Sequence, residues 1–189
     1  MRHPFITRTS SSVWSCPWFC IREDAIILPD GKETTYWYAE KPDSVFIVPV
    51  TCQGDIVLIR SFRHPMNEWF WEIPAGRAEE GQSPEDAACK ELREETGGIA
   101  DSWQSIGRYC PNGGFLKSYS HIFLATGVVL GKPQHEPEEQ IEIHPTPIRK
   151  ALDMVRNGTM TSAQSALALL LCEQQLKAIG ISAGTAAPE

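Results

Sequence analysis

The chain has 189 residues, enough for one domain with a small appendage, and is 42% hydrophobic and 22% charged, as folded soluble proteins are. Its formal net charge of -7 argues against a protein that binds the phosphate backbone of nucleic acids, because such proteins are usually basic. A small anionic ligand held through metal ions is compatible with this charge.

The cysteines and the apolar runs indicate the cellular compartment in which the protein is expected. The six cysteines are scattered without a CxxC pair, and Cys16 and Cys20, which could be half of a zinc site, have no matching second pair. Free thiols in a reducing, cytoplasmic setting are the simpler interpretation. The N-terminal stretch MRHPFITRTS lacks the apolar centre of a signal peptide, and the longest apolar run, Ala166 to Cys172, is too short to cross a bilayer. We therefore expect a cytoplasmic protein that does not bind membranes.

The first forty residues predict a β-hairpin. Two runs of aromatic and branched side chains, Pro17 to Leu28 and Glu33 to Ala39, flank the turn sequence Pro29-Asp30-Gly31. Lys41-Pro42-Asp43 interrupts the pattern. The expected organisation is an N-terminal β extension over residues 1–42, a main domain over 43–180 and a flexible tail over 181–189.

The main domain reads as strands with one helix in the middle and two at the end. The polar, Pro-rich stretch Gly131 to Glu139 is expected to be a loop. This pattern indicates the α+β class. The expected strands are Val45–Val50, Asp55–Phe62, Trp69–Ile73, Trp103–Tyr109, Ser118–Val129 and Ile141–Ile143, and the expected helices are Pro84–Thr96, Ile148–Arg156 and Ser162–Ile179.

The middle helix carries an acidic cluster. Ser83 can cap it, Pro84 suits its first position, and a Gly-Gly pair ends it. At about 100° per residue, Glu91, Glu94 and Glu95 fall within an arc of roughly 100°. Taken alone, this cluster fits a solvated charged face. The alternative is a site for a hard divalent cation, which prefers carboxylate oxygens.

The residues before the helix favour the cation site. Pro74-Ala75-Gly76 ends a strand and begins a loop that returns to the helix, so backbone carbonyls there could supply further oxygen ligands. The fixed spacing of Gly76, Gln82 and the run Lys90-Glu91-Leu92-Arg93-Glu94-Glu95-Thr96-Gly97-Gly98 resembles the signature of the Nudix hydrolases. Three positions depart from it: Gln82 stands for Glu, Lys90 for Arg, and Gly98 for an apolar residue.

The resemblance covers roughly Trp18 to Glu173. The stretches SFRHPMNEWFWEIPAGRAEEG and ALDMVRNGTMTSAQSALALLL resemble the ADP-ribose pyrophosphatase branch. It implies a Nudix-type α/β/α sandwich with a mixed sheet and an N-terminal β-strand extension. In this branch the extension serves the substrate side and usually joins two chains in a homodimer.

The resemblance also implies roles for particular residues. The Ala75 carbonyl, Glu91 and Glu95 would bind Mg²⁺ or Mn²⁺, with support from Glu94. Gln82 and Lys90 would pair, without a full ion pair, to brace the loop against the helix. Arg63 looks like a phosphate-binding arginine, although a surface arginine is the alternative.

Two further groups of residues are assigned by resemblance to the substrate side and to the attacking water. Trp18 and Tyr36 match positions that can hold an adenine ring, although aromatics in strands more often lie in cores or interfaces. Gly114 belongs to a substrate-side loop, after which Lys117 and Ser118 stand where many relatives carry an acid. Glu139 is the residue expected to position or activate the attacking water, and Glu138 is the second choice. Glu136 and Glu142 lie nearby in the sequence. The alternative for any one of these is a solvated acidic loop.

The sequence therefore predicts metal-dependent hydrolysis of the diphosphate bond in nucleoside diphosphate sugars, with ADP-ribose yielding AMP and ribose 5-phosphate. GDP-mannose or another nucleotide sugar is the rival substrate. A Nudix-type sensor that binds its ligand and barely hydrolyses it is the rival from another class.

Overall fold

The computed structural model describes residues 3–137 and 139–185, which form two compact units. The first unit comprises Met1–Asp43 and Cys110–Tyr119, and the second comprises Ser44–Tyr109 and Ser120–Glu189. The segment Cys110–Tyr119 was not expected to join the N-terminal residues. None of the described helices is long and apolar enough to cross a membrane.

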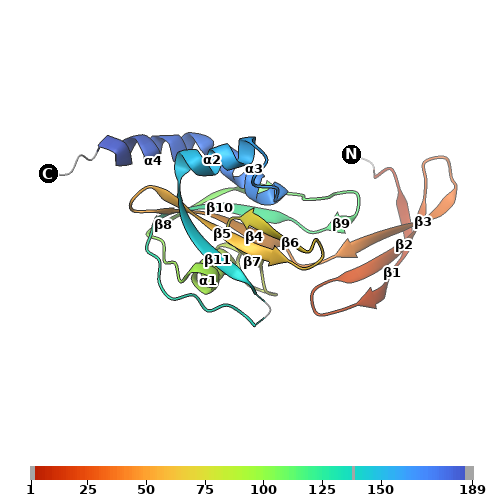
Figure 1. Cartoon of the computed structure of the whole chain (residues 1–189). Helices are drawn as coiled ribbons and strands as arrows, with labels where there is room; N and C mark the ends of the chain where they lie inside the picture. The colour runs from red at the N-terminus through yellow and green to blue at the C-terminus, as the bar shows by residue number, and fades with distance from the viewer. Residues whose placement is uncertain (1–2, 138, 186–189) are drawn as a thin grey trace. The chain divides into compact units, whose positions relative to one another are not determined.

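The first unit is a four-stranded sheet in the order β1-β2-β3-β9 (Figure 1). Its strands are β1 (Ile6–Ser15), β2 (Cys20–Ile27), β3 (Glu33–Glu40) and β9 (Leu116–Lys117). The expected hairpin is confirmed: β2 and β3 pair antiparallel around Gly31, whose φ of 84° suits glycine. The sequence analysis missed β1, because its run of Ser and Thr lacks apolar alternation and all ten residues are exposed.

The second unit is built on a mixed sheet in the order β11-β5-β4-β10-β8. The pair β4–β10 is parallel, and the neighbours β11–β5, β4–β5 and β10–β8 are antiparallel. Its strands are β4 (Ser44–Thr51), β5 (Asp55–Arg63), β6 (Glu68–Glu72), β7 (Ala75–Arg77), β8 (Ser102–Tyr109), β10 (Ser120–Val128) and β11 (Ile141–Pro147).

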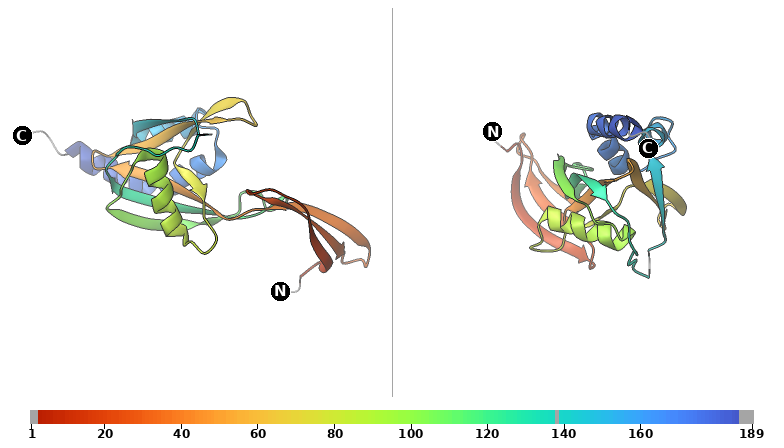
Figure 2. Two further views of the ribbon diagram at one scale, coloured as in Figure 1. Left: turned by 90° about the horizontal axis from the view of Figure 1, so that it is seen from below. Right: turned by 90° about the vertical axis from the view of Figure 1, so that its left-hand side faces the viewer.

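Helices cover both faces of this sheet, as Figures 1 and 2 show. They are α1 (Pro84–Thr96), α2 (Ile148–Arg156), α3 (Ala163–Leu171) and α4 (Glu173–Thr185). Alternate residues of one strand serve the two faces: Val45 packs in the core with α1, whereas Val48 packs in the core with α2, α3 and α4. The expected α+β class and sandwich are confirmed.

A split between two strands shapes the middle of the sheet. The strands β4 and β5 pair only near their turn, at Val50 and Ile56. Farther along, β6 pairs with β5 and β7 pairs with β4, so the segment from β6 to β7 fills the gap. The strand β7 was expected to be loop, and it is the last strand before the acidic helix, from which a loop of residues 78–83 separates it.

The C-terminal helix predicted over Ser162–Ile179 is wrong as one element. It is two helices, α3 and α4, which meet at the fully buried Cys172. The continuous apolar run through this point hid the break, because both helices bury apolar residues in the same core. The last strand is also longer than expected, since β11 extends to Pro147.

Candidate active site

The helix α1 has the predicted ends. Ser83 Oγ accepts the Asp86 N–H at 3.1 Å, and Gly97 closes the helix in the left-handed conformation with φ 66°. Ala87, Ala88 and Leu92 are fully buried against the sheet. This packing fixes the rotation of the helix, and with it the direction of each glutamate.

Glu95 points at the edge of β7. Its Oε2 accepts the Ala75 N–H at 2.9 Å, and the residue is only 4% exposed. Ala75 lies opposite Phe46 of β4, while Ile47 N–H donates to the Pro74 carbonyl, so Ala75 and Phe46 are a non-hydrogen-bonded pair. The N–H and the carbonyl of Ala75 therefore point away from β4, toward the side where the Glu95 carboxylate lies.

Glu91 lies against the next residue of β7. A Cβ at Gly76 would collide with the Glu91 carboxylate, so only glycine lets the strand and this side chain approach so closely. The Arg77 N–H also hydrogen-bonds the Glu91 side chain. The two carboxylates thus meet the same short strand, which explains the glycine at the start of the motif.

Both carboxyl groups are destabilised as anions. Burial, and then the charges of Glu94 and Glu139, raise the pKa of Glu91 to about 7, against the opposing effect of Lys90. Burial raises the pKa of Glu95 well above its usual range, although the Ala75 hydrogen bond opposes the shift. Lys90 and Arg63 oppose these shifts only in part, so both groups favour a bound proton or a positive charge close by.

Glu94 is partly exposed and lies close enough to Glu91 for its charge to raise the pKa of that residue. Its side chain is 38% exposed, and its Oε2 is 3.7 Å from Lys90 Nζ. Among the described residues, no three Asp, Glu, His or Cys side chains converge into a preformed metal-binding group. The structure brings together Glu91, Glu95 and the edge of Ala75, and leaves Glu94 beside a lysine.

The brace between loop and helix differs from the expectation. Lys90 Nζ binds Glu79 Oε1 at 2.6 Å, and Gln82 Oε1 accepts the Glu79 N–H at 3.1 Å. The expected direct Gln82–Lys90 pair is wrong, because both side chains bind Glu79 instead. The full ion pair is kept, with Glu79 supplying the carboxylate.

The loop after β10 approaches the same helix. The Gln134 N–H donates to the Glu94 carbonyl at 2.8 Å, and His135 Nε2 lies 2.8 Å from the Glu95 carbonyl. These contacts hold the loop at the C-terminal turn of α1. The negative charge of Glu139 is consequently felt by both Glu91 and Glu95, whose pKa values it raises.

The other loop acids are placed differently. The Glu139 carboxylate accepts the Glu136 N–H at 2.9 Å, which fixes its direction. Glu142 lies on β11 with its Oε2 3.7 Å from Arg60 Nη1 and 3.3 Å from His144 Nε2. Glu138 lies outside the described residues.

Arg63 ends β5 and binds the neighbouring strand. Its Nη2 and Nε contact Glu72 Oε2 at 2.6 and 2.8 Å, and Glu72 is only 8% exposed. The charge of Arg63 also lowers the pKa of Glu95 slightly against the effect of burial. The arginine is therefore held near the acidic pair, with its side chain 47% exposed.

Three predicted substrate residues belong to the first unit. Tyr36 Oη donates to the Gly114 carbonyl at 2.8 Å, and both residues line a cavity of about 340 Å³ with Phe115 and Tyr119. Trp18 lies in the β1–β2 turn and is 66% exposed. The structure thus brings Tyr36 and Gly114 together and does not place Trp18 on the same cavity.

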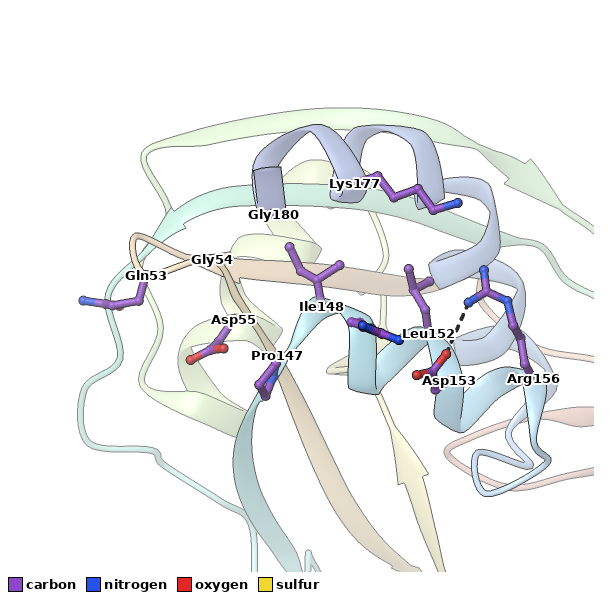
Figure 3. A pocket seen from close by; sticks show the side chains of 11 residues that line it. Gln53, Gly54, Asp55, Pro147, Ile148, Leu152, Asp153, Arg156, Lys177 and Gly180 are labelled. Atoms are coloured by element: carbon purple, nitrogen blue, oxygen red, sulfur yellow. Dashed lines mark ion pairs between the residues drawn. The ribbon is translucent and has the colours of Figure 1, made fainter. Parts of the chain in front are cut away.

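The second unit contains a larger cavity away from the carboxylates (Figure 3). It has a volume of about 720 Å³ and lies between the β4–β5 turn, the start of α2 and α4. Arg156 on its wall is already paired with Asp153 and Glu173, and Lys177 is paired with Glu173. We assign the candidate active site to Glu91 and Glu95 and not to this cavity. These two cations of the cavity wall are already ion-paired, whereas the carboxylates of Glu91 and Glu95 are desolvated at β7.

The donor set at α1 fits a hard divalent cation. Carboxylate oxygens and a backbone carbonyl are the ligands that Mg²⁺ and Mn²⁺ prefer. A cation here would offset two buried negative charges and could use the Ala75 carbonyl that points away from β4. The residues present therefore suit the metal that the sequence predicted.

Sequence reasoning missed Glu79, Gln134 and His135. Glu79 is visible in the sequence as an acid three residues before Gln82, but its partner depends on how the loop folds back. Gln134 and His135 act through contacts with backbone carbonyls of α1, which carry no signal in the side-chain pattern.

Comparison with known proteins agrees with this geometry. Residues 40–161 match the model of the NUDIX domain. The chain is 33% identical over 144 residues to the ADP-ribose pyrophosphatase of Bacillus subtilis, covering 75% of this chain and 78% of that protein. It is 30% identical to the ADP-ribose pyrophosphatase of Mycobacterium tuberculosis, covering 85% and 79%.

A solved structure has the same fold. The crystal structure of an ADP compounds hydrolase superposes with a TM-score of 0.82 at 20% identity, covering 94% of this chain and 97% of that one. Together with the extent of the domain match, these similarities show that the chain belongs to the Nudix family of pyrophosphohydrolases.

Proposed function

We propose that this chain hydrolyses the diphosphate bond of nucleoside diphosphate sugars with a divalent cation, and that ADP-ribose is its first substrate, yielding AMP and ribose 5-phosphate. The observation that carries the proposal is the convergence of two carboxylates on the short strand β7: the partly buried Glu91 lies against Gly76, and the buried Glu95 accepts the Ala75 N–H. The names of the two pyrophosphatase relatives support the substrate.

Glu91, Glu95 and the Ala75 carbonyl would hold Mg²⁺ or Mn²⁺, with Glu94 in support. When bound, the cation neutralises charge on the phosphate oxygens and lowers the pKa of a water that it binds. The protein's part is to fix these oxygens, and the Ala75 N–H to Glu95 bond does so at the strand edge.

Glu139 would accept the proton of the attacking water. Its charge reaches both metal-binding glutamates, and the Glu136 N–H orients its carboxylate. Glu142 is less suited, because it is occupied by Arg60 and His144. Arg63, held by Glu72 near Glu95, would bind a phosphate of the substrate with its remaining donors.

The first unit would serve the substrate and a second copy of the chain. Tyr36 and Gly114 line an aromatic cavity that could accept a nucleobase, and Trp18 supplies a further exposed ring. Exposed aromatic side chains of the first unit, such as Trp14 and Trp37, support a homodimer formed through the N-terminal extension. We place the protein in the cytoplasm, in keeping with its six free cysteines.

The identity of the sugar stays open in the test. Lys117 is ion-paired with Glu40, and the Ser118 hydroxyl donates to the Pro42 carbonyl, so both side chains are engaged within the first unit. GDP-mannose and other nucleotide sugars are therefore tested beside ADP-ribose.

The test is a panel of nucleotide sugars incubated with Mg²⁺ or Mn²⁺, with products separated by chromatography. Release of AMP from ADP-ribose, dependent on the cation, is the expected result. Faster cleavage of GDP-mannose would replace ADP-ribose as the proposed substrate and leave the proposed reaction unchanged. Ligand binding without cleavage of any member would support the sensor and contradict the enzyme.

A further inference from the structure

We propose that Ser165 of α3 is a positioning residue for the cation site, acting through the crossing segment Glu72–Ala75. This role rests on the proposed function, because it is defined by the metal that Ala75 and Glu95 would hold. Ser165 lies in the helical layer on the face of the sheet opposite α1, so it does not touch the metal-binding carboxylates.

The contact is a buried hydrogen bond between distant parts of the chain. The Ile73 N–H donates to Ser165 Oγ at 3.2 Å across 92 residues of sequence. Both residues are fully buried. Ser162 Oγ lies 3.1 Å from Ser165 Oγ, so a second hydroxyl holds the first in place.

Three successive residues of the crossing segment, Ile73, Pro74 and Ala75, each make a hydrogen bond to a different element. Ile73 leaves the β5 ladder after Glu72 and is held by Ser165. The Pro74 carbonyl accepts the Ile47 N–H of β4 at 2.9 Å, and the Ala75 N–H donates to Glu95. Three consecutive residues are thus fixed by α3, β4 and α1 in turn, so the contact from α3 lies two residues before Ala75.

A serine at this position is otherwise unfavourable. It shares the interior of α3 with the fully buried Ala168 and Leu169. A buried hydroxyl is costly unless it is hydrogen-bonded, and the bond it makes satisfies an N–H that the sheet leaves without a ladder partner. Without this hydroxyl, Ile73 would have to move toward another acceptor, and Ala75 would move with it.

The experiment measures Mn²⁺ binding by electron paramagnetic resonance on the folded, full-length protein. Ser165→Ala is expected to weaken Mn²⁺ affinity about tenfold or more, the usual effect of losing a group that orients a metal ligand. The control is Leu176→Val in α4, which removes buried apolar volume from the same core. It should lower the melting temperature without changing Mn²⁺ affinity, because a leucine side chain makes no hydrogen bond to the crossing segment.

Ser165→Cys keeps the shape of the side chain with a somewhat larger terminal atom and offers a weaker acceptor, and it serves if the alanine variant does not fold. It should weaken Mn²⁺ binding in the same direction. Unchanged Mn²⁺ affinity in the folded Ser165 variants would overturn the role, as would an equal loss in Leu176→Val. Failure of the unmodified protein to bind Mn²⁺ would instead remove the proposed function, and this role with it.

Discussion

Two groups of acids on and around α1 have opposite environments. Glu94 and Glu79 lie at the surface, and Lys90 is ion-paired with both. The partly buried Glu91 and the buried Glu95 face β7. Burial raises both pKa values, the charge of Glu94 raises that of Glu91, and the charge of Glu139 raises both. The surface acids are thus compensated by a lysine of the chain, whereas the buried pair requires a proton or an external cation.

This difference separates two environments for carboxylates on a single helix. A run such as KELREE does not reveal which glutamates are buried, because that depends on how α1 packs and where β7 runs. Two contacts with β7 distinguish these glutamates from the other acids: Gly76 approaches Glu91 closely, and the Ala75 N–H donates to Glu95. The following predictions test it in order of decreasing effect.

The largest effect is expected from Glu139→Gln. If Glu139 accepts the proton of the attacking water, its loss should lower kcat about a hundredfold to ten-thousandfold, the usual contribution of a general base. Steady-state rates of AMP release from ADP-ribose, at saturating Mg²⁺, measure this. Glu142→Gln is the matched control and should keep most of the rate, because Glu142 is occupied by Arg60 and His144. Near-normal turnover in Glu139→Gln would contradict the assignment.

The next effect concerns metal-linked stability. Saturating Mg²⁺ should raise the melting temperature of the unmodified protein by about 5–10 °C if its concentration is about a hundred times the dissociation constant. Glu95→Gln should abolish most of this rise, while its amide oxygen can still accept the Ala75 N–H. Differential scanning fluorimetry gives the comparison, and a full rise in the variant would argue for a solvated acidic face.

The metal effect should also depend on pH. The folded-state pKa of Glu91 is raised from 4.5 to about 7, so the metal-free protein holds an extra proton between these values. Its stability from this group is fully present below the unfolded pKa and is lost as pH rises through about 7. A cation replaces the proton, so the rise in melting temperature with Mg²⁺ should be larger at about pH 8 than at about pH 5.

The variant Glu91→Gln is the check on this pH effect. It cannot titrate, so the part of the pH dependence that comes from residue 91 should disappear. A metal-induced rise that is the same at both pH values in the unmodified protein would exclude proton–metal competition at the buried pair.

The smallest effect is expected at the surface brace. Glu79→Gln should lower the melting temperature by at most about 2 °C and leave Mn²⁺ affinity nearly unchanged, since exposed ion pairs contribute little. Lys90→Met should behave alike, and the double variant should show non-additivity, because Glu79 and Lys90 are direct partners. Strict additivity in a thermal melt would mean that the pair makes no contribution.

The parts of the fold that sequence could predict depend on local signals. The ends of α1 follow from Ser83, Pro84 and the glycine pair, which act within a few residues of the helix. The strand β1 lacks such a signal, and the division at Cys172 is hidden inside a continuous apolar run. The motif that resembles the Nudix signature likewise marked Glu91, Glu94 and Glu95 together, and only the fold shows that Glu91 and Glu95 face β7.

The rest of the site depends on contacts between distant residues. The partner of Lys90 is Glu79 because the loop folds back on the helix, and the partner of Ile73 is 92 residues away. His135 meets a backbone carbonyl of α1, an interaction that side-chain patterns do not encode. Such contacts require the tertiary structure, which is why the sequence did not predict the residues that hold the loop and the helix.

The most direct test of the central claim is a Mn²⁺ titration of Glu91→Gln beside Glu94→Gln. The two substitutions remove the same charge from the same helix, three residues apart, one from the buried pair and one from the surface. We expect Glu91→Gln to weaken Mn²⁺ binding about tenfold or more, and Glu94→Gln to have a clearly smaller effect. An equal or larger loss in Glu94→Gln, or unchanged binding in Glu91→Gln, would contradict the claim that the buried carboxylates hold the cation.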